Sequence, residues 1–379
     1  MSILQYNFPT TIRFGAGAVQ ELGPYLKKHQ LVAPLIVTDP TVAQLPFFKQ
    51  LISRLSAQSI AVEVFSEIHK NPVKSDVYKG TDYWDNTKRD CVIGIGGGAA
   101  IDVARSIVLR VNHREDLFVY DDLIGGDVFV TNDVPHFITI PTTAGTGSEV
   151  GRSAIIADDE TYQKKILFSP KLLAKIIFAD PELTYDLPAF ITAATGMDAL
   201  THNMEAYLAK MHHPLCEGIA LEGISLIHQS LETAVNNPTP EARANMLIAS
   251  LMGAVAFQKG LGIVHSLAHP LSSLLDTHHG LANAINLPYG MEFNIAGAED
   301  KFKRIAQVLA LKEQIGEAVV NYLFQLNSDI NIPHHLKEIG VKSEHIETLS
   351  DLAIADFAHP NNHKPVSREN FKELYHKAL

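Results

Sequence analysis

The chain has 379 residues, of which 46% are hydrophobic and 19% are charged, and its formal net charge is −11. This composition can fill two sizeable cores and excludes a disordered chain. The acidic balance disfavours a nucleic-acid-binding protein, which needs clustered Lys and Arg to displace counterions, and it gives no attraction to an anionic membrane surface.

The cysteines and the start of the chain bear on the cellular compartment in which the protein is expected. Two cysteines, Cys91 and Cys216, lie far apart in the sequence, which argues against a disulfide scaffold and fits a reducing environment. The first nine residues lack the basic and apolar regions of a signal peptide. No apolar run reaches the roughly 18 residues that a membrane span needs. We therefore expect a cytoplasmic protein without a membrane partner.

The first half of the chain alternates short apolar runs with helical patterns. Candidate buried strands are residues 35–38, 62–65, 91–95, 137–140 and 176–179. Strands separated by helices predict βαβ units and a mostly parallel sheet. From about residue 184 long helical patterns replace the strands, at residues 188–209, 216–235 and 240–258. We predict a Rossmann-like α/β dinucleotide-binding domain over residues 1–183 and an all-α domain over residues 184–379.

Two loops follow strands of the predicted sheet and suit a phosphate group. Residues 94–99 read Gly-Ile-Gly-Gly-Gly-Ala and open a predicted helix, where glycines let the backbone approach a pyrophosphate. This pattern also fits a tight turn without a ligand. Residues 141–149, Pro-Thr-Thr-Ala-Gly-Thr-Gly-Ser-Glu, follow another strand. Ligands of open α/β sheets bind at the carboxyl ends of the strands, so the two loops together favour a nucleotide site.

Asp39 follows the first strong strand. A carboxylate there can accept hydrogen bonds from ribose hydroxyls and would repel a 2′-phosphate, which favours NAD over NADP. The alternative is that Asp39 and Pro40 only start a turn, a common role for Asp. The sequence leaves both interpretations open.

Histidines at helical spacing suggest a metal site in the second half. Asp198 and His202 are four residues apart in a predicted helix, as are His265 and His269, and His279 is followed by Gly280. Side chains four apart share a helix face, so each pair can reach one ion. A carboxylate with several imidazoles suits Fe²⁺ or Zn²⁺ better than Mg²⁺ or Ca²⁺.

These segments together resemble the iron-containing (group III) alcohol dehydrogenases over nearly the whole chain. The matching segments are residues 14–18, 96–102, 141–150, 180–183, 196–202, 265–270 and 279–284. The resemblance implies the dehydroquinate synthase-like pair of domains predicted above and metal ligands at Asp198, His202, His265 and His279. It implies contacts to NAD from Asp39, Asn71, Gly97, Gly98, Thr142, Thr143, Lys164 and Leu183.

The resemblance implies an NAD(P)-dependent alcohol dehydrogenase that uses Fe²⁺, or Zn²⁺ as the alternative, on a small primary alcohol or aldehyde, and a possible homodimer. His269 lies one turn after a ligand, so it either relays the proton of the alcohol or only packs beside the site. Competing activities are a zinc-dependent glycerol-type dehydrogenase and a dehydroquinate synthase, whose phosphorylated substrate needs a pocket rich in Lys and Arg.

The substrate is the least determined feature. The residue Phe257 stands one position away from the usual aromatic pocket position of the family. Arg152 and Lys259 lie near the metal in this family, so they could bind an anionic aldehyde of the semialdehyde or phosphonate type. Because most Lys and Arg side chains reach outward to solvent, the favoured substrate is a short neutral alcohol.

Overall fold

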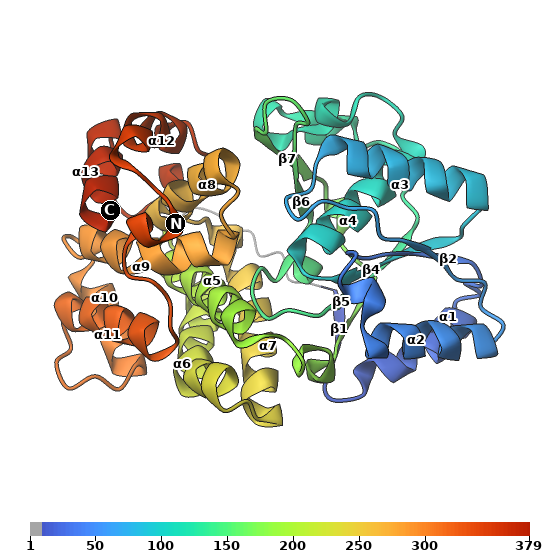
Figure 1. The fold of residues 1–379 in the computed structure, drawn as a ribbon, viewed down its shortest axis with the longest axis horizontal. Helices are drawn as coiled ribbons and strands as arrows, with labels where there is room; N and C mark the ends of the chain where they lie inside the picture. Colours follow the sequence, from blue (N-terminus) through green and yellow to red (C-terminus); the bar gives the residue numbers. More distant parts are fainter. Residues whose placement is uncertain (1–9) are drawn as a thin grey trace. The chain divides into compact units, whose positions relative to one another are not determined.

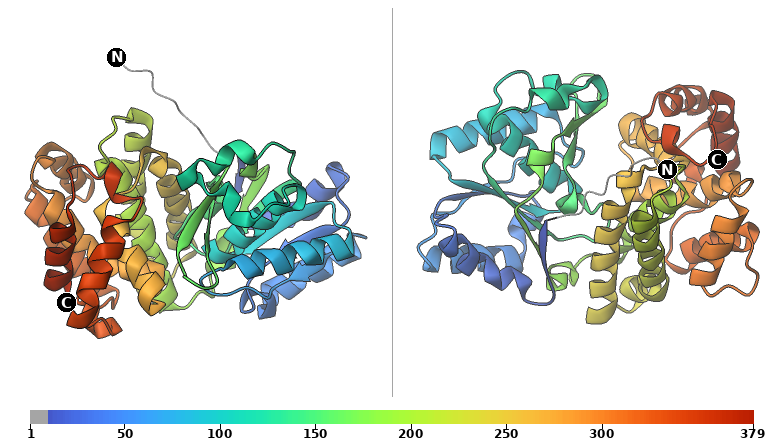
Figure 2. Two further views of the ribbon diagram at one scale, coloured as in Figure 1. Left: turned by 90° about the horizontal axis from the view of Figure 1, so that it is seen from above. Right: turned by 180° about the vertical axis from the view of Figure 1, so that it is seen from behind.

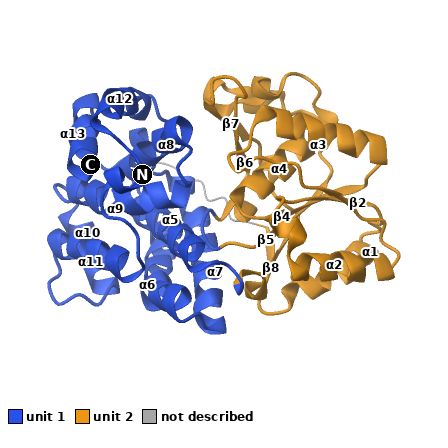
Figure 3. Cartoon of the chain, in the orientation of Figure 1, with its two compact units in different colours: residues 1–8, 144–146, 185–379 blue, residues 9–143, 147–184 orange. Residues whose placement is uncertain are grey.

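The computed structural model describes residues 10–379, so the first nine residues, on which the expectation of no signal peptide depends, lie outside the described part. The described chain forms two compact units (Figure 3). Unit 2 contains residues 10–143 and 147–184, and unit 1 contains residues 144–146 and 185–379. The predicted metal ligands lie in unit 1, and the predicted cofactor contacts lie in unit 2.

Unit 2 is built on a six-stranded sheet with the strand order β1-β8-β5-β4-β2-β3 (Figure 1). Every neighbouring pair in it is parallel, which confirms the predicted sheet. Its strands are β1 (Thr11–Phe14), β2 (Pro34–Val37), β3 (Glu63–Phe65), β4 (Cys91–Gly96), β5 (His136–Pro141) and β8 (Ile176–Ala179). β1 escapes the sequence analysis because it is a short edge strand whose residues are mostly exposed, so no apolar run marks it.

Helices cover both faces of this sheet (Figures 1 and 2). α1 (Leu22–Lys28) and α2 (Pro46–Ala57) pack their apolar sides into one core with the sheet residues Ile36, Ile93 and Ile138. α3 (Lys74–Thr87) and α4 (Gly98–Asn112) lie on the opposite face. A hairpin of β6 (Ser153–Ala157) and β7 (Lys164–Phe168) completes the unit.

Unit 1 is helical, as the sequence predicts. Its helices are α5 (Ala189–Leu208), α6 (Pro214–Asn236), α7 (Pro240–Ala256), α8 (Ile263–Leu275), α9 (His279–Asn294), α10 (Glu299–Val308), α11 (Gly316–Asp329), α12 (Ile346–Ile354) and α13 (Arg368–Ala378). α5 is buried from Thr192 to its end, because α6, α7 and α9 all pack against it. Polar side chains on α5 therefore face protein rather than solvent, which requires partners for them.

Within residues 10–379 no single helix is long and apolar enough to cross a membrane. Residues 240–259 and 263–275 pass by length and composition only when they are taken as a pair, and that pair is bent by 107°.

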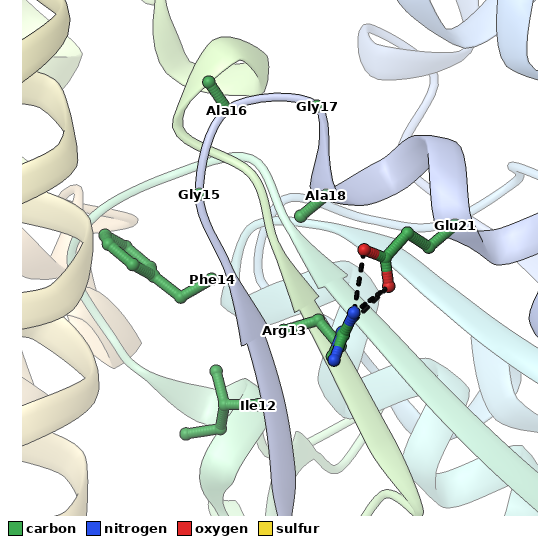
Figure 4. Close-up of a pocket in the computed structure, with 8 residues that line it drawn as sticks. All are labelled: Ile12, Arg13, Phe14, Gly15, Ala16, Gly17, Ala18 and Glu21. Carbon is green, nitrogen blue, oxygen red and sulfur yellow. Dashed lines mark hydrogen bonds and ion pairs between the residues drawn. The ribbon is translucent and has the colours of Figure 1, made fainter.

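A small pocket lies at the turn that follows β1 (Figure 4). It has a volume of about 310 Å³ and is lined by residues 12–18 and Glu21. Arg13 Nε donates to Glu21 Oε2 at 2.8 Å, so the two charges on its wall satisfy each other. Asp180 accepts from the backbone N–H groups of Gly17 and Val19 and fixes the turn. None of the predicted cofactor, metal or catalytic residues lines this pocket.

Candidate functional site

Three helices of unit 1 bring the four predicted metal ligands together. Asp198 and His202 lie one turn apart on α5, His265 is on α8, and His279 begins α9. Asp198 Oδ1 lies 4.0 Å from His202 Nε2, 4.0 Å from His265 Nε2 and 3.5 Å from His279 Nε2. Ligand atoms around a tetrahedral ion with bonds of roughly 2.1 Å are about 3.4 Å apart. The observed separations are close to that spacing.

Burial keeps His202 in the protonation state that a metal ligand needs. Asp198, His202 and His265 are each at most 5% exposed. Burial, together with the neighbouring His265, lowers the pKa of His202 to about 4 against the opposing effect of Asp198. The His202 imidazole is therefore neutral near pH 7 and keeps a lone pair for a cation. One carboxylate and three imidazoles form a donor set that fits Fe²⁺ or Zn²⁺.

Glu205 orients one of these histidines. Its Oε2 lies 2.6 Å from His265 Nδ1, and its Oε1 accepts from the backbone N–H of Val264 at 2.6 Å. Burial opposes the charged imidazole, but the hydrogen bond and the charge of Glu205 raise the pKa of His265. With the proton held on Nδ1, Nε2 is left facing Asp198, the arrangement that a carboxylate gives to metal-binding histidines. The sequence analysis missed Glu205, although it follows Asp198 by seven residues, two turns along the same face.

Replacing Glu205 with Gln tests this role. Gln keeps the shape but removes the charge, so the protein should keep its fold and bind Zn²⁺ about 10–100-fold more weakly. Titration against a competing chelator measures the affinity. Glu222→Gln on the exposed side of α6 is the matched control and should leave the Kd unchanged. An unaltered Kd in Glu205→Gln would show that Glu205 serves only packing.

His269 lies beside the cluster and also has a carboxylate partner. Its ring stacks on that of His279, with the centroids 5.3 Å apart and the planes at 15°. Asp356 Oδ2 lies 2.8 Å from His269 Nδ1, and Asp356 Oδ1 accepts from Ser266 Oγ at 2.6 Å. Burial would raise the pKa of Asp356, but His269 and Ser266 lower it to about 2. Asp356 is thus a second residue that the sequence analysis missed.

Lys259 does not lie where either interpretation of the sequence puts it. We expected this side chain to reach solvent or to offer its charge to a substrate, but it is only 2% exposed. Its Nζ donates to Tyr207 O and lies 2.8 Å from Glu217 Oε1, a carboxylate oxygen that also pairs with Lys301. Lys259 is held here because α5 ends at Leu208, and the backbone carbonyl groups at the C-terminus of a helix, such as that of Tyr207, attract a cation.

In unit 2 the starts of the two predicted phosphate loops lie side by side, while residues 144–146 of the second loop belong to unit 1. β4 and β5 are neighbours, with Gly96 paired to Pro141, and Thr142 N donates to Gly96 O at 3.0 Å. Gly96 has φ +148°, and a Cβ there would lie 2.7 Å from that of Ala100, so only glycine fits. Gly97 caps α4, whose N-terminal N–H groups suit an anion.

The other predicted NAD contacts are spread over unit 2. Asp39 Oδ1 accepts from the backbone N–H groups of Thr41 and Val42, both at 2.9 Å, which is the turn role considered above. Its Oδ2 lies 3.4 Å from where a Cβ of Gly96 would be, on the side of the glycine loop. Asn71 precedes α3 and Lys164 begins β7, while Leu183 packs against the sheet core.

Comparison with known proteins identifies the family. The family description "Iron-containing alcohol dehydrogenase" matches residues 9–181, and "Fe-containing alcohol dehydrogenase family, C-terminal" matches residues 192–379. The 4-hydroxybutyrate dehydrogenase of Cupriavidus necator is 34% identical, over 98% of each chain. The chain belongs to the iron-containing alcohol dehydrogenase family. This confirms the resemblance and the predicted enzyme class, an oxidoreductase that acts on CH–OH groups.

Solved structures of this family share the whole fold. A 1,3-propanediol oxidoreductase has a TM-score of 0.95 and 30% identity and is covered completely, as is this chain. The sulfoacetaldehyde reductase of Bifidobacterium kashiwanohense, solved in complex with NAD⁺, has a TM-score of 0.88 and 26% identity over 100% of this chain and 99% of that one. The relatives named here, which share this fold with the iron-containing alcohol dehydrogenase described above, act on small alcohols and aldehydes.

Proposed function

We propose that the protein is a metal-dependent NAD(H) dehydrogenase that interconverts a short primary alcohol and its aldehyde. The observation that carries this proposal is the buried group of Asp198, His202 and His265, whose ligand atoms lie within 4.8 Å of one another. The partly exposed His279 adds a third imidazole, with its Nε2 3.5 Å from Asp198 Oδ1. A bound Fe²⁺ or Zn²⁺ would supply a Lewis acid for the substrate oxygen, and the nicotinamide would exchange the hydride.

The residues of the chain then have separate tasks. Asp198, His202, His265 and His279 would hold the ion, and Glu205 would keep His265 in the tautomer that binds it. His269, with its Nδ1 held by Asp356, presents Nε2 to exchange the proton of the alcohol. In unit 2 the glycine loop and Thr142 would bind the pyrophosphate of the cofactor.

The direct test is the assay of protein purified without oxygen and loaded separately with Fe²⁺ and Zn²⁺. We expect steady NADH formation from a short primary alcohol, and NADH consumption with propanal, that depend on the added ion. A chelator should stop both reactions. Release of phosphate from a phosphorylated substrate without net NADH formation would favour a dehydroquinate synthase-type lyase, and dehydrogenase activity unchanged by the chelator would refute the proposal.

A second candidate is the reduction of small anionic aldehydes. Relatives named for 4-hydroxybutyrate and sulfoacetaldehyde act on compounds that carry an anionic group. Of the two candidate cations, Lys259 already pairs with Glu217, so we consider Arg152 as the residue that would bind the anionic group of the substrate. It is half-buried, its guanidinium lies 5.5 Å from the Phe168 ring centroid, and no carboxylate within residues 10–379 pairs with it. A higher kcat/KM for succinic semialdehyde than for propanal, lost in Arg152→Ala, would favour this substrate class.

The proposed preference for NAD rests on Asp39. Asp39→Gly removes the carboxylate that would repel a 2′-phosphate, so the ratio of kcat/KM for NAD to that for NADP should fall about tenfold or more. Because Asp39 also accepts two backbone hydrogen bonds of its turn, Asp39→Asn is the companion variant, which keeps an acceptor oxygen. If the ratio stays unchanged in both variants, Asp39 serves the turn alone.

His269→Ala should lower kcat about 10²-fold or more while the protein keeps a full complement of metal, because general acid–base catalysis by a positioned side chain contributes that much. Asp356→Asn should lower kcat less and shift the pH profile, since it removes the charge that holds the imidazole. Metal content and the pH dependence of kcat separate the possibilities. Loss of metal would make His269 a ligand, and an unchanged kcat would make it a packing residue.

A further inference from the structure

Asn283 contacts the proposed metal ligands Asp198, His265 and His279, and the proposed chemistry gives it no role. It lies one turn after His279 on α9 and is fully buried. Its Nδ2 lies 2.7 Å from Asp198 Oδ1, 3.1 Å from His279 Nε2 and 3.3 Å from His265 Nε2. The two N–H groups of this amide are therefore shared among three of the four proposed metal ligands. Its Oδ1 is buried and has no hydrogen-bond partner within residues 10–379.

These hydrogen bonds and a cation compete for the same atoms. Glu205 holds the proton of His265 on Nδ1, so Nε2 offers a single lone pair. That lone pair can accept from Asn283 or coordinate an ion, but it cannot do both. Asp198 differs, because each carboxylate oxygen has further lone pairs and can keep an amide donor while it binds a cation.

The metal-free protein has a clear need for such a donor. Asp198 is a carboxylate only 2% exposed, and within residues 10–379 its hydrogen-bond donor is Asn283 Nδ2. A buried charge without a donor is costly, and imidazole lone pairs that face a carboxylate repel it. The N–H groups of the Asn283 amide carry partial positive charge. They therefore offset part of the repulsion between the ligand atoms, as a cation would.

We propose that Asn283 is a positioning residue that holds the ligand set together in the metal-free protein. When an ion binds, its amide gives up the hydrogen bonds to His265 and His279 and keeps the one to Asp198. This inference rests on the proposed function, since it takes these residues as metal ligands. A group that stabilises the metal-free form more than the metal-bound form must weaken metal binding by the corresponding factor.

The test compares wild type with Asn283→Ala in the full-length protein, after removal of metal with a chelator and titration with Zn²⁺. Asn283→Ala should bind Zn²⁺ about tenfold more tightly, because a hydrogen-bonded competitor has been removed. Its melting temperature should fall more in the metal-free form than in the Zn²⁺-saturated form. Asn283→Ser, whose hydroxyl is too short to bridge the three ligands, should behave in the same way and serves if the Ala variant fails to fold.

Asn286→Ala is the matched control. Asn286 lies on the same helix, is 1% exposed and also has an Oδ1 without a hydrogen-bond partner among residues 10–379, but its Nδ2 donates to the backbone carbonyl of Ala282. Its loss should lower both melting temperatures equally and leave the Kd unchanged.

Two results would overturn the inference in distinguishable ways. Weaker Zn²⁺ binding in Asn283→Ala, with a larger loss of stability in the Zn²⁺-saturated form than in the metal-free form, would mean that Asn283 supports the loaded site instead. In that case the proposed function would stand. If wild type binds no divalent ion stoichiometrically, both the proposed function and the role of Asn283 fail together.

Discussion

His202→Ala is expected to abolish stoichiometric metal binding and to lower kcat/KM about 10³-fold or more, since a Lewis acid contributes several kcal/mol to such a reaction. His202 is neutral near pH 7 because burial lowers its pKa to about 4, so its main contribution is a lone pair rather than a charge. The fold should persist, because α5 keeps its packing against α6, α7 and α9. Metal analysis and steady-state kinetics on the same preparation provide the measurement.

His228→Ala is the matched control for this experiment. His228 is also a helical histidine of unit 1, on α6, and its Nδ1 lies 2.9 Å from Tyr322 OH. It has no part in the His cluster, so its replacement should leave metal content and kcat/KM within about twofold of wild type. Full metal content and activity in His202→Ala would show that the ligand set is wrong.

Gly280→Ala should destabilise the protein by about 2–3 kcal/mol and weaken metal binding together with it. An added Cβ would lie 2.3 Å from Ala194 O and 3.3 Å from Asp198 Cβ, so α9 would have to move away from α5. Gly280 follows His279 directly, and the movement would separate that ligand from Asp198. Urea unfolding of both variants, with and without Zn²⁺, measures the two effects.

Gly218→Ala provides the comparison. Gly218 lies within α6, and an added Cβ there would meet nothing within 4 Å. The free energy of unfolding of this variant should be about 0.5–1 kcal/mol higher than that of wild type, because alanine in a helix loses less backbone entropy than glycine on folding. Equal stability of Gly280→Ala and wild type would mean that α5 and α9 can separate without cost.

Local patterns in the sequence predicted the main elements because their causes are local. The apolar runs of β2, β4, β5 and β8 are each buried on both faces, which is why they contain almost no polar residue. The four-residue spacing of Asp198 and His202 places both on one face of α5 whatever packs against it. Gly96 in the 94–99 loop is likewise demanded locally, by its positive φ and by the close approach of Ala100 four residues later.

The parts that the sequence left undetermined depend on pairings between distant residues. Glu205 meets His265 across 60 positions of sequence, Asp356 meets His269 across 87, and Asn283 meets Asp198 across 85. Periodicity carries no information about such pairs, because it records only which face of its own element a residue occupies. Lys259 shows the same limit, since the carboxylate that neutralises it lies on another helix. The sequence alone determined the main elements and the chemical types of the site residues. Tertiary packing decided which carboxylates orient His265 and His269, and it paired Lys259 with Glu217.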